Sequence, residues 1–127
     1  MTLKPATINF TLGNGLAIYK GSSWKVSIGV EEDGKPYDLT GYVGKCSIKE
    51  HTGDEEPILE PKVVIGDNGN FDLILSSEET STLPTNGKNH YEVSTYQYDV
   101  YFIEDEEYYR TLQGFVDVSP TITEEND

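Results

Sequence analysis

The sequence predicts an all-β protein, folded as one antiparallel β-sandwich of about seven strands with a single short helix near residues 77–83. Three observations lead to this prediction. Apolar residues recur at every second position in several segments, which is the pattern of half-buried strands. Turn-forming residues separate these segments at short intervals, and only one segment breaks the alternation.

Four segments alternate strongly and are expected to be strands. Their apolar positions are Trp24, Val26, Ile28 and Val30; Phe71, Leu73 and Leu75; Tyr98, Val100 and Phe102; and Leu112, Gly114, Val116 and Val118. Weaker candidates are Ile8, Phe10 and Leu12; Cys46 and Ile48; and Val63 and Ile65. In each strand, one face is expected to pack in the core and the other to face outward.

The turns between these strands have recognisable chemistry. Asp33-Gly34 and Asn68-Gly69 are hairpin signals, because Asn, Asp and Gly tolerate positive φ. Residues 104–107 are all acidic and should form a solvated hairpin tip between two long strands. In the segment that breaks the alternation, Ser76 or Ser77 can cap a short helix, which Pro84 then stops.

The 127 residues fit one domain. We expect an N-terminal arm with a possible edge strand over residues 1–20, the sandwich over residues 21–119, and an acidic tail over residues 120–127. The sequence has no apolar stretch long enough to span a membrane and none resembling a signal peptide, which predicts a protein made in a cytosol.

Charge narrows the range of partners. The chain has 23 acidic and 9 basic residues, and its formal net charge is −14. Such a field repels phosphate backbones and anionic lipid, so neither nucleic acid nor membrane is an expected partner.

No pattern predicts catalysis or a cofactor. Cys46 is the only cysteine, so no intramolecular disulfide forms, and with His51 and His90 at unrelated spacings it builds no zinc site. Residues 67–72 faintly resemble a calcium loop but lack the spacing and the closing glutamate of an EF-hand. The acidic clusters fall in predicted turns or at the helix start, so we expect neither an enzyme nor a metal site.

Tyrosines are concentrated in the last two predicted strands and their approach. Tyr98 belongs to the core row, whereas Tyr101 has the opposite parity and should face outward. Exposed tyrosines suit protein interfaces or sugar stacking, or they merely cover the sheet. The candidates for an interface are Tyr96, Tyr101, Tyr108 and Tyr109.

An ordered series of short motifs resembles one protein family. The motifs are Gly21-Ser22-Ser23-Trp24; Asp33-Gly34-Lys35-Pro36-Tyr37-Asp38-Leu39-Thr40-Gly41; Asn68-Gly69-Asn70-Phe71-Asp72-Leu73; Ser76-Ser77-Glu78-Glu79-Thr80; Tyr98-Asp99-Val100; and Leu112-Gln113-Gly114-Phe115-Val116-Asp117-Val118. In this order they resemble small structural proteins of tailed phages, which look like the immunoglobulin-like N-terminal domain of upper baseplate proteins. The resemblance covers residues 21 to about 123, and the long C-terminal extension with receptor-binding function is missing from this sequence.

The resemblance implies an immunoglobulin-like sandwich and a virion protein, assembled in the host cytoplasm. It would be a baseplate, tail, neck or head-decoration subunit that docks on other virion structural proteins, and it could form a homo-oligomer within the assembly. In that role Ile8, Phe10 and Leu12 of the arm could donate a strand to a partner's sheet edge. The alternative is a carbohydrate-binding module that contacts host surface glycans through Tyr96, Gln97 and Tyr101.

Overall fold

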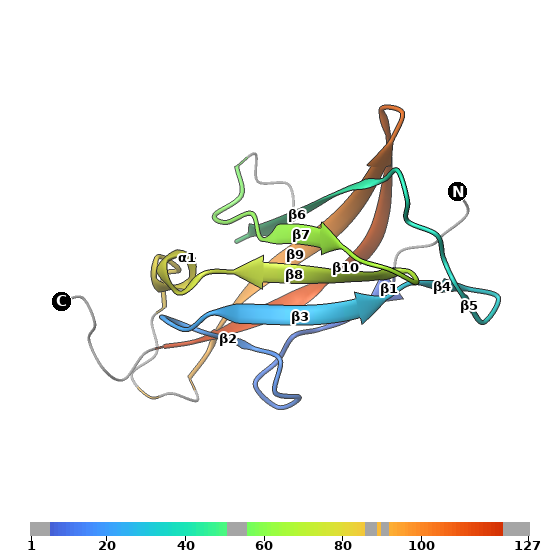
Figure 1. Ribbon diagram of the computed structural model, residues 1–127. Coiled ribbons are helices and arrows are strands. Elements are labelled where there is room, and N and C mark those ends of the chain that lie inside the picture. Colours follow the sequence, from blue (N-terminus) through green and yellow to red (C-terminus); the bar gives the residue numbers. More distant parts are fainter. Residues whose placement is uncertain (1–5, 51–55, 86–88, 90–91, 121–127) are drawn as a thin grey trace.

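The computed structural model describes residues 6–50, 56–85, 89 and 92–120 and shows an all-β sandwich (Figure 1). A five-stranded sheet has the order β1-β10-β9-β6, with β2 also paired to β10, and a three-stranded sheet has the order β3-β8-β7. A small hairpin of β4 and β5 extends from one end. The predicted fold class is confirmed.

Ten strands and one helix lie within the described residues. They are β1 (Ala6–Thr7), β2 (Ile18–Tyr19), β3 (Trp24–Gly29), β4 (Glu31–Glu32), β5 (Lys35–Pro36), β6 (Val43–Lys49), β7 (Lys62–Ile65), β8 (Asn70–Leu75), α1 (Ser77–Ser81), β9 (Ser94–Glu104) and β10 (Glu107–Ser119). The alternating segments fall on β3, β6, β7, β8, β9 and β10, except the weaker one at residues 8–12, where only Phe10 pairs, in an isolated bridge to Val116. The additional strands are two-residue pairings, which are too short to produce an alternation.

The core lies between the two sheets and is joined by aromatic contacts. Phe71 of β8 meets Phe102 of β9 edge-on, with ring centroids 5.0 Å apart. Phe10 meets Trp24 of β3 edge-on at 5.5 Å and stacks on Tyr98 of β9 at 4.9 Å. Such contacts add to the free energy of burial, so each sheet's inner face depends on the other.

Cys46 is part of this core, as the alternation predicts. Burial raises the pKa of its thiol, because the thiolate would lose its hydration there. The side chain therefore behaves as a small apolar group.

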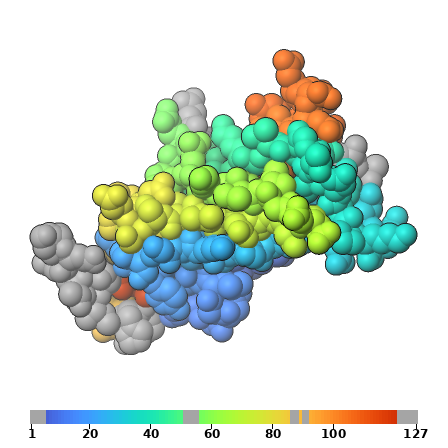
Figure 2. All heavy atoms as spheres, in the orientation of Figure 1, coloured from blue at the N-terminus to red at the C-terminus, as the bar shows by residue number. Residues whose placement is uncertain are grey.

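The predicted turns have the expected backbone. Asp33 and Gly34 connect β4 to β5, and Asn68 and Gly69 connect β7 to β8, all with positive φ. The acidic tip between β9 and β10 has the same geometry at Asp105 and Glu106, although neither is glycine or asparagine. This tip stands clear of the body of the protein (Figure 2).

Helix α1 begins with a capping box, which settles the choice between the two candidate caps. The Ser76 hydroxyl accepts from the Glu79 amide at 3.1 Å, and the Glu79 carboxylate accepts from the Ser76 amide at 2.8 Å. Thr80 is fully buried and joins the helix to the turn before β3, donating to the Ser22 carbonyl at 2.9 Å and accepting from the Gly21 amide at 3.0 Å. The helix ends at Ser81, two residues before the predicted end.

The N-terminal segment differs most from expectation. Its strands β1 and β2 run parallel to β10, so one edge of the predicted antiparallel sandwich is parallel. Phe10 and Ile18 are buried in the common core. Residues 6–19, expected to belong to an N-terminal arm with a possible edge strand, thus do supply an edge strand and also contribute to the core.

Two aromatic side chains hold this segment in place. The Tyr98 hydroxyl donates to the Ile8 carbonyl at 2.7 Å, and the Trp24 indole donates to the Leu16 carbonyl at 3.0 Å. Gly114 lies where β10 meets the segment, and a Cβ there would be 2.2 Å from the Ile8 carbonyl oxygen. Only glycine therefore permits this close approach.

Several predicted features lie outside the described residues. These are the first five residues of the arm, His51 with the turn that follows it, His90, and the acidic tail after Pro120.

Substituting Gly114 tests the seating of the N-terminal segment. We expect Gly114→Ala to lower the free energy of unfolding by about 1–3 kcal/mol, because the new methyl group overlaps the Ile8 carbonyl and the Asn9 side chain. Urea unfolding measures this loss. Gly13→Ala is the matched control, since a Cβ at Gly13 meets nothing within 4 Å; an equal effect of both substitutions would contradict the close approach.

Candidate functional site

The outer face of the five-stranded sheet is the candidate site. Strand alternation turns Cys46 and Ile48 of β6 inward, so Lys45, Ser47 and Lys49 face outward. In β9 the odd-numbered residues 97–103 face outward in the same way, because Tyr98, Val100 and Phe102 are buried.

A β-bulge gives β10 its outward residues. The register with β9 shifts between Arg110 and Leu112, which leaves Thr111 as the extra residue. Before the shift, Tyr108 and Arg110 face outward; after it, Gln113 and Phe115 do. Without the bulge, Leu112 would lie on the outer face.

The register arranges these side chains in rows across β6, β9 and β10. The rows are Val43, Ile103 and Tyr108; Lys45, Tyr101 and Arg110; Ser47, Asp99 and Gln113; and Lys49, Gln97 and Phe115. On the far side of β10, Thr7 of β1 pairs with Gln113, and the Asn9 side chain accepts from the Phe115 amide at 2.9 Å.

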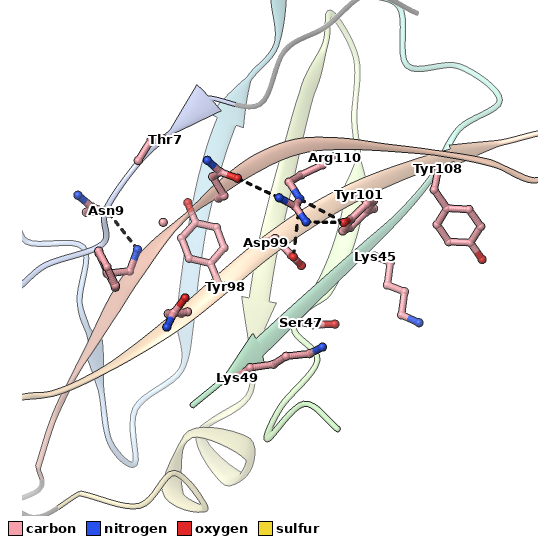
Figure 3. A pocket seen from close by; sticks show the side chains of 14 residues that line it. Thr7, Asn9, Lys45, Ser47, Lys49, Tyr98, Asp99, Tyr101, Tyr108 and Arg110 are labelled. Atoms are coloured by element: carbon pink, nitrogen blue, oxygen red, sulfur yellow. Dashed lines mark hydrogen bonds and ion pairs between the residues drawn. The ribbon is translucent and has the colours of Figure 1, made fainter. Parts of the chain in front are cut away.

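This face is hollowed into a groove of about 790 Å³ (Figure 3). Tyr108 and Phe115 lie toward opposite ends of the rows and are 63% and 51% exposed. Charged and amide side chains lie between them. Large exposed aromatic rings beside polar groups are typical of a surface that binds another molecule.

Arg110, Tyr101 and Asp99 form a cluster at the centre of the groove. The Arg110 guanidinium lies 5.5 Å from the Tyr101 ring centroid and donates to the Tyr101 hydroxyl at 2.9 and 3.1 Å. Its Nε is 4.0 Å from the Asp99 carboxylate. Tyr101 also meets Tyr108 edge-on at 6.3 Å. These contacts hold the guanidinium in one orientation on the groove floor.

The cluster changes the acidity of its members. Burial raises the pKa of Asp99, although Arg110 and Lys49 act in the opposite direction. The hydrogen bond to Tyr101, assisted by Asp99, raises the pKa of Arg110 above its ordinary value. Arg110 therefore stays charged at every accessible pH.

The charge of the groove is opposite to that of the chain. Among the described residues, three basic side chains line it, namely Lys45, Lys49 and Arg110, and Asp99 is the one acidic side chain that does. The groove is thus a local cationic surface on a strongly acidic protein, and it favours anionic or aromatic ligands.

The structure brings together two of the predicted interface tyrosines and separates the others. Tyr101 and Tyr108 both lie in the groove. Tyr109 pairs with the buried Phe102 on the opposite face of the sheet. Tyr96 is buried, and its hydroxyl donates to the Pro84 carbonyl. An interface role requires an exposed side chain, and Tyr96 is not exposed. Tyr96 has the same parity as the core residue Tyr98, so both face the core.

The three candidates in the N-terminal segment are engaged within the chain. Phe10 is buried between Trp24 and Tyr98, so it is not available as a strand donor to a partner in this fold. Ile8 is half-buried, and its amide donates to the Gln113 carbonyl. Leu12 is half-buried, with its amide 3.4 Å from the Asp117 carboxylate.

Sequence reasoning missed much of the groove. Lys45 and Lys49 have the parity opposite to Cys46, and Phe115 has the parity opposite to Val116, so alternation alone could have identified them as outward-facing. Arg110 could not have been found in this way, because its orientation depends on the bulge at Thr111.

Among the described residues there is neither a metal-binding cluster nor a membrane-spanning helix. In that part of the chain, no three His, Cys, Asp or Glu side chains are grouped so that they could hold a metal ion. None of the helical structure described there has the length and apolarity of a membrane span.

Comparison with known proteins adds no family. The sequence matches no protein-family model and no curated protein.

Neutralising Asp99 tests the electrostatics of the groove. The folded-state pKa of Asp99 lies above its ordinary value of 3.8, so ionisation costs more in the folded protein than in the unfolded chain. This cost is absent well below pH 3.8 and is complete above the folded-state pKa. We expect Asp99→Asn to raise the urea midpoint at pH 7 and to have little effect near pH 3. A lower midpoint at pH 7 would show that the attraction to Arg110 dominates instead.

Proposed function

We propose that this chain is a structural protein of a tailed-phage virion, a baseplate, tail, neck or head-decoration subunit, that docks on other virion proteins. The groove on the outer face of the five-stranded sheet is its docking site. In this proposal the protein is not an enzyme, its partners are other virion structural proteins, and it functions within the assembled particle.

The composition of the groove is the observation that carries the docking role. Tyrosine, phenylalanine and arginine are enriched at the centres of protein interfaces. The aromatic rings combine a large contact area with few rotatable bonds, and the planar guanidinium can form several hydrogen bonds at once. The groove places Tyr101, Tyr108, Phe115 and Arg110 on one face, and the guanidinium is already oriented by its contacts. A preorganised face loses less conformational entropy on binding than a flexible one.

The assignment to a virion is supported by the ordered motifs and by the fold. The motifs that resemble the immunoglobulin-like domains of phage baseplate proteins extend over most of the chain. An all-β sandwich is the fold that this resemblance implies. The central contacts of the groove are also compatible with a docking role. Arg110 stacks on the Tyr101 ring and forms an ion pair with Asp99.

Light scattering of the protein with the other structural proteins of its source particle tests the proposal. We expect a defined complex with at least one of them. Tyr108→Ala combined with Phe115→Ala should weaken this complex by tenfold or more, about 1.4 kcal/mol or more, since exposed aromatic anchors contribute much of an interface's binding energy.

The matched control is Tyr19→Ala combined with Val64→Ala, which removes exposed apolar side chains away from the groove. This control should bind normally. If no virion protein binds, or if both double variants bind like the wild type, the proposed docking site is wrong.

Glycan binding is the second candidate. Tyr101, Tyr108 and Phe115 are aromatic side chains of the groove, and Gln97 and Gln113 add amides that could bind sugar hydroxyls. A glycan array distinguishes the two functions: specific array binding that Tyr101→Ala abolishes would favour a carbohydrate-binding module, and an empty array would remove it.

A further inference from the structure

The cations of the groove have a regular spacing. Lys45 and Lys49 are four residues apart on β6 and face the same side, so their Cα atoms are separated by about 13 Å. Arg110 lies in the same row as Lys45, on the other side of Tyr101. An extended chain repeats with the same period, so its side chains at positions i and i+4 can reach both rows at once.

The edge of the sheet beside the groove is partly closed. The Ile48 amide donates to the Leu59 carbonyl at 2.9 Å, and the Ile58 amide donates to the Ile48 carbonyl at 2.8 Å. A partner segment therefore cannot extend the sheet along all of β6. The groove instead receives a ligand over the face of the sheet.

The row between the two cationic rows has a different chemistry. It consists of Ser47, Asp99 and Gln113, and the Asp99 carboxylate lies half-buried at its centre. A negative side chain placed over this row would be repelled. Beyond Lys45, the next row is apolar, with Val43 and Tyr108 each 63% exposed.

We propose that the groove binds an extended acidic segment of a partner protein, with carboxylates four residues apart, an uncharged residue midway between them, and an apolar residue two positions beyond one carboxylate. This inference rests on the proposed docking function and names the chemistry of the partner. Carboxylates at positions i and i+4 meet the rows of Lys45 and Lys49, and the apolar residue meets Val43 and Tyr108.

Charge complementarity selects this occupant. Counting the described residues, the groove carries three cations and one carboxylate, on a chain with a net charge of −14. A second copy placed face to face would bring the same cations together, which disfavours a symmetric dimer through this surface.

Synthetic peptides test the proposal by calorimetric titration at low and at physiological salt. The first probe is Leu-Thr-Glu-Thr-Ser-Thr-Glu with blocked ends. The second replaces both glutamates by glutamine. The third is the second peptide with a glutamate in place of the serine, so it carries a single glutamate. We expect the first peptide to bind most tightly, the second about five- to thirtyfold more weakly, and the third no better than the second. Added salt should weaken the first peptide more than the second.

Charge reversal in the protein provides the second arm of the test. We expect Lys45→Glu combined with Lys49→Glu to remove the preference for the first peptide. Lys35→Glu combined with Lys62→Glu is the matched control, because it makes the same change in net charge at exposed positions outside the groove. The control should retain the preference.

Four results would overturn the inference. These are no binding of the first peptide, equal binding of all three peptides, equal binding by both charge-reversed variants, and displacement of the first peptide by neutral oligosaccharide alone. Failure of this inference can be distinguished from failure of the proposed docking function. If the Lys45→Glu and Lys49→Glu variant still joins a virion-protein complex that the Tyr108→Ala and Phe115→Ala variant does not join, docking stands and the acidic partner is wrong.

Discussion

The pairing of β9 with β10 is the interaction on which the rest of the structure depends. Its inner face supplies the buried Tyr98, Val100 and Phe102, against which the three-stranded sheet packs. Its outer face supplies most of the groove. The bulge at Thr111 lets β10 contribute to both faces, because it reverses the parity of the strand. Arg110 and Gln113 therefore both face outward, while Leu112 stays in the core. The core and the candidate site are therefore the two faces of one hairpin.

The N-terminal segment completes this arrangement at the other edge of β10. It follows β10 in parallel, inserts Phe10 between Trp24 and Tyr98, and places Asn9 beside Phe115 at the rim of the groove. Its seating requires Gly114, the residue of β10 that the Ile8 carbonyl approaches. The groove and the N-terminal segment are consequently coupled, since a disturbance at this edge would move the backbone of Phe115. This coupling makes the segment a part of the proposed docking face and not a free donor strand.

Alternation and turn chemistry in the sequence are sufficient to predict the fold class, the main strands, the buried Cys46 and the capped helix. These features depend on local rules: period two for strands, positive φ at Asn68 and Gly69, and the capping box at Ser76. Features that depend on tertiary contact were not predictable in the same way. The parallel pairing of residues 6–19 needs a partner strand about a hundred residues away, and the bulge at Thr111 has no local signal. The burial of Tyr96 was predictable, because Tyr96 has the same parity as the core residue Tyr98; its choice as an interface candidate ignored that rule.

We have proposed that partners contact the outer face of the five-stranded sheet. Amide chemical-shift mapping of the protein, with and without a virion protein that forms a complex with it, tests this proposal most directly. We expect shifts concentrated in β6, in β9 from Gln97 to Ile103, and in β10 from Tyr108 to Phe115, with little change in β3, β7 and β8. Shifts concentrated in the three-stranded sheet, with the groove unchanged, would contradict it.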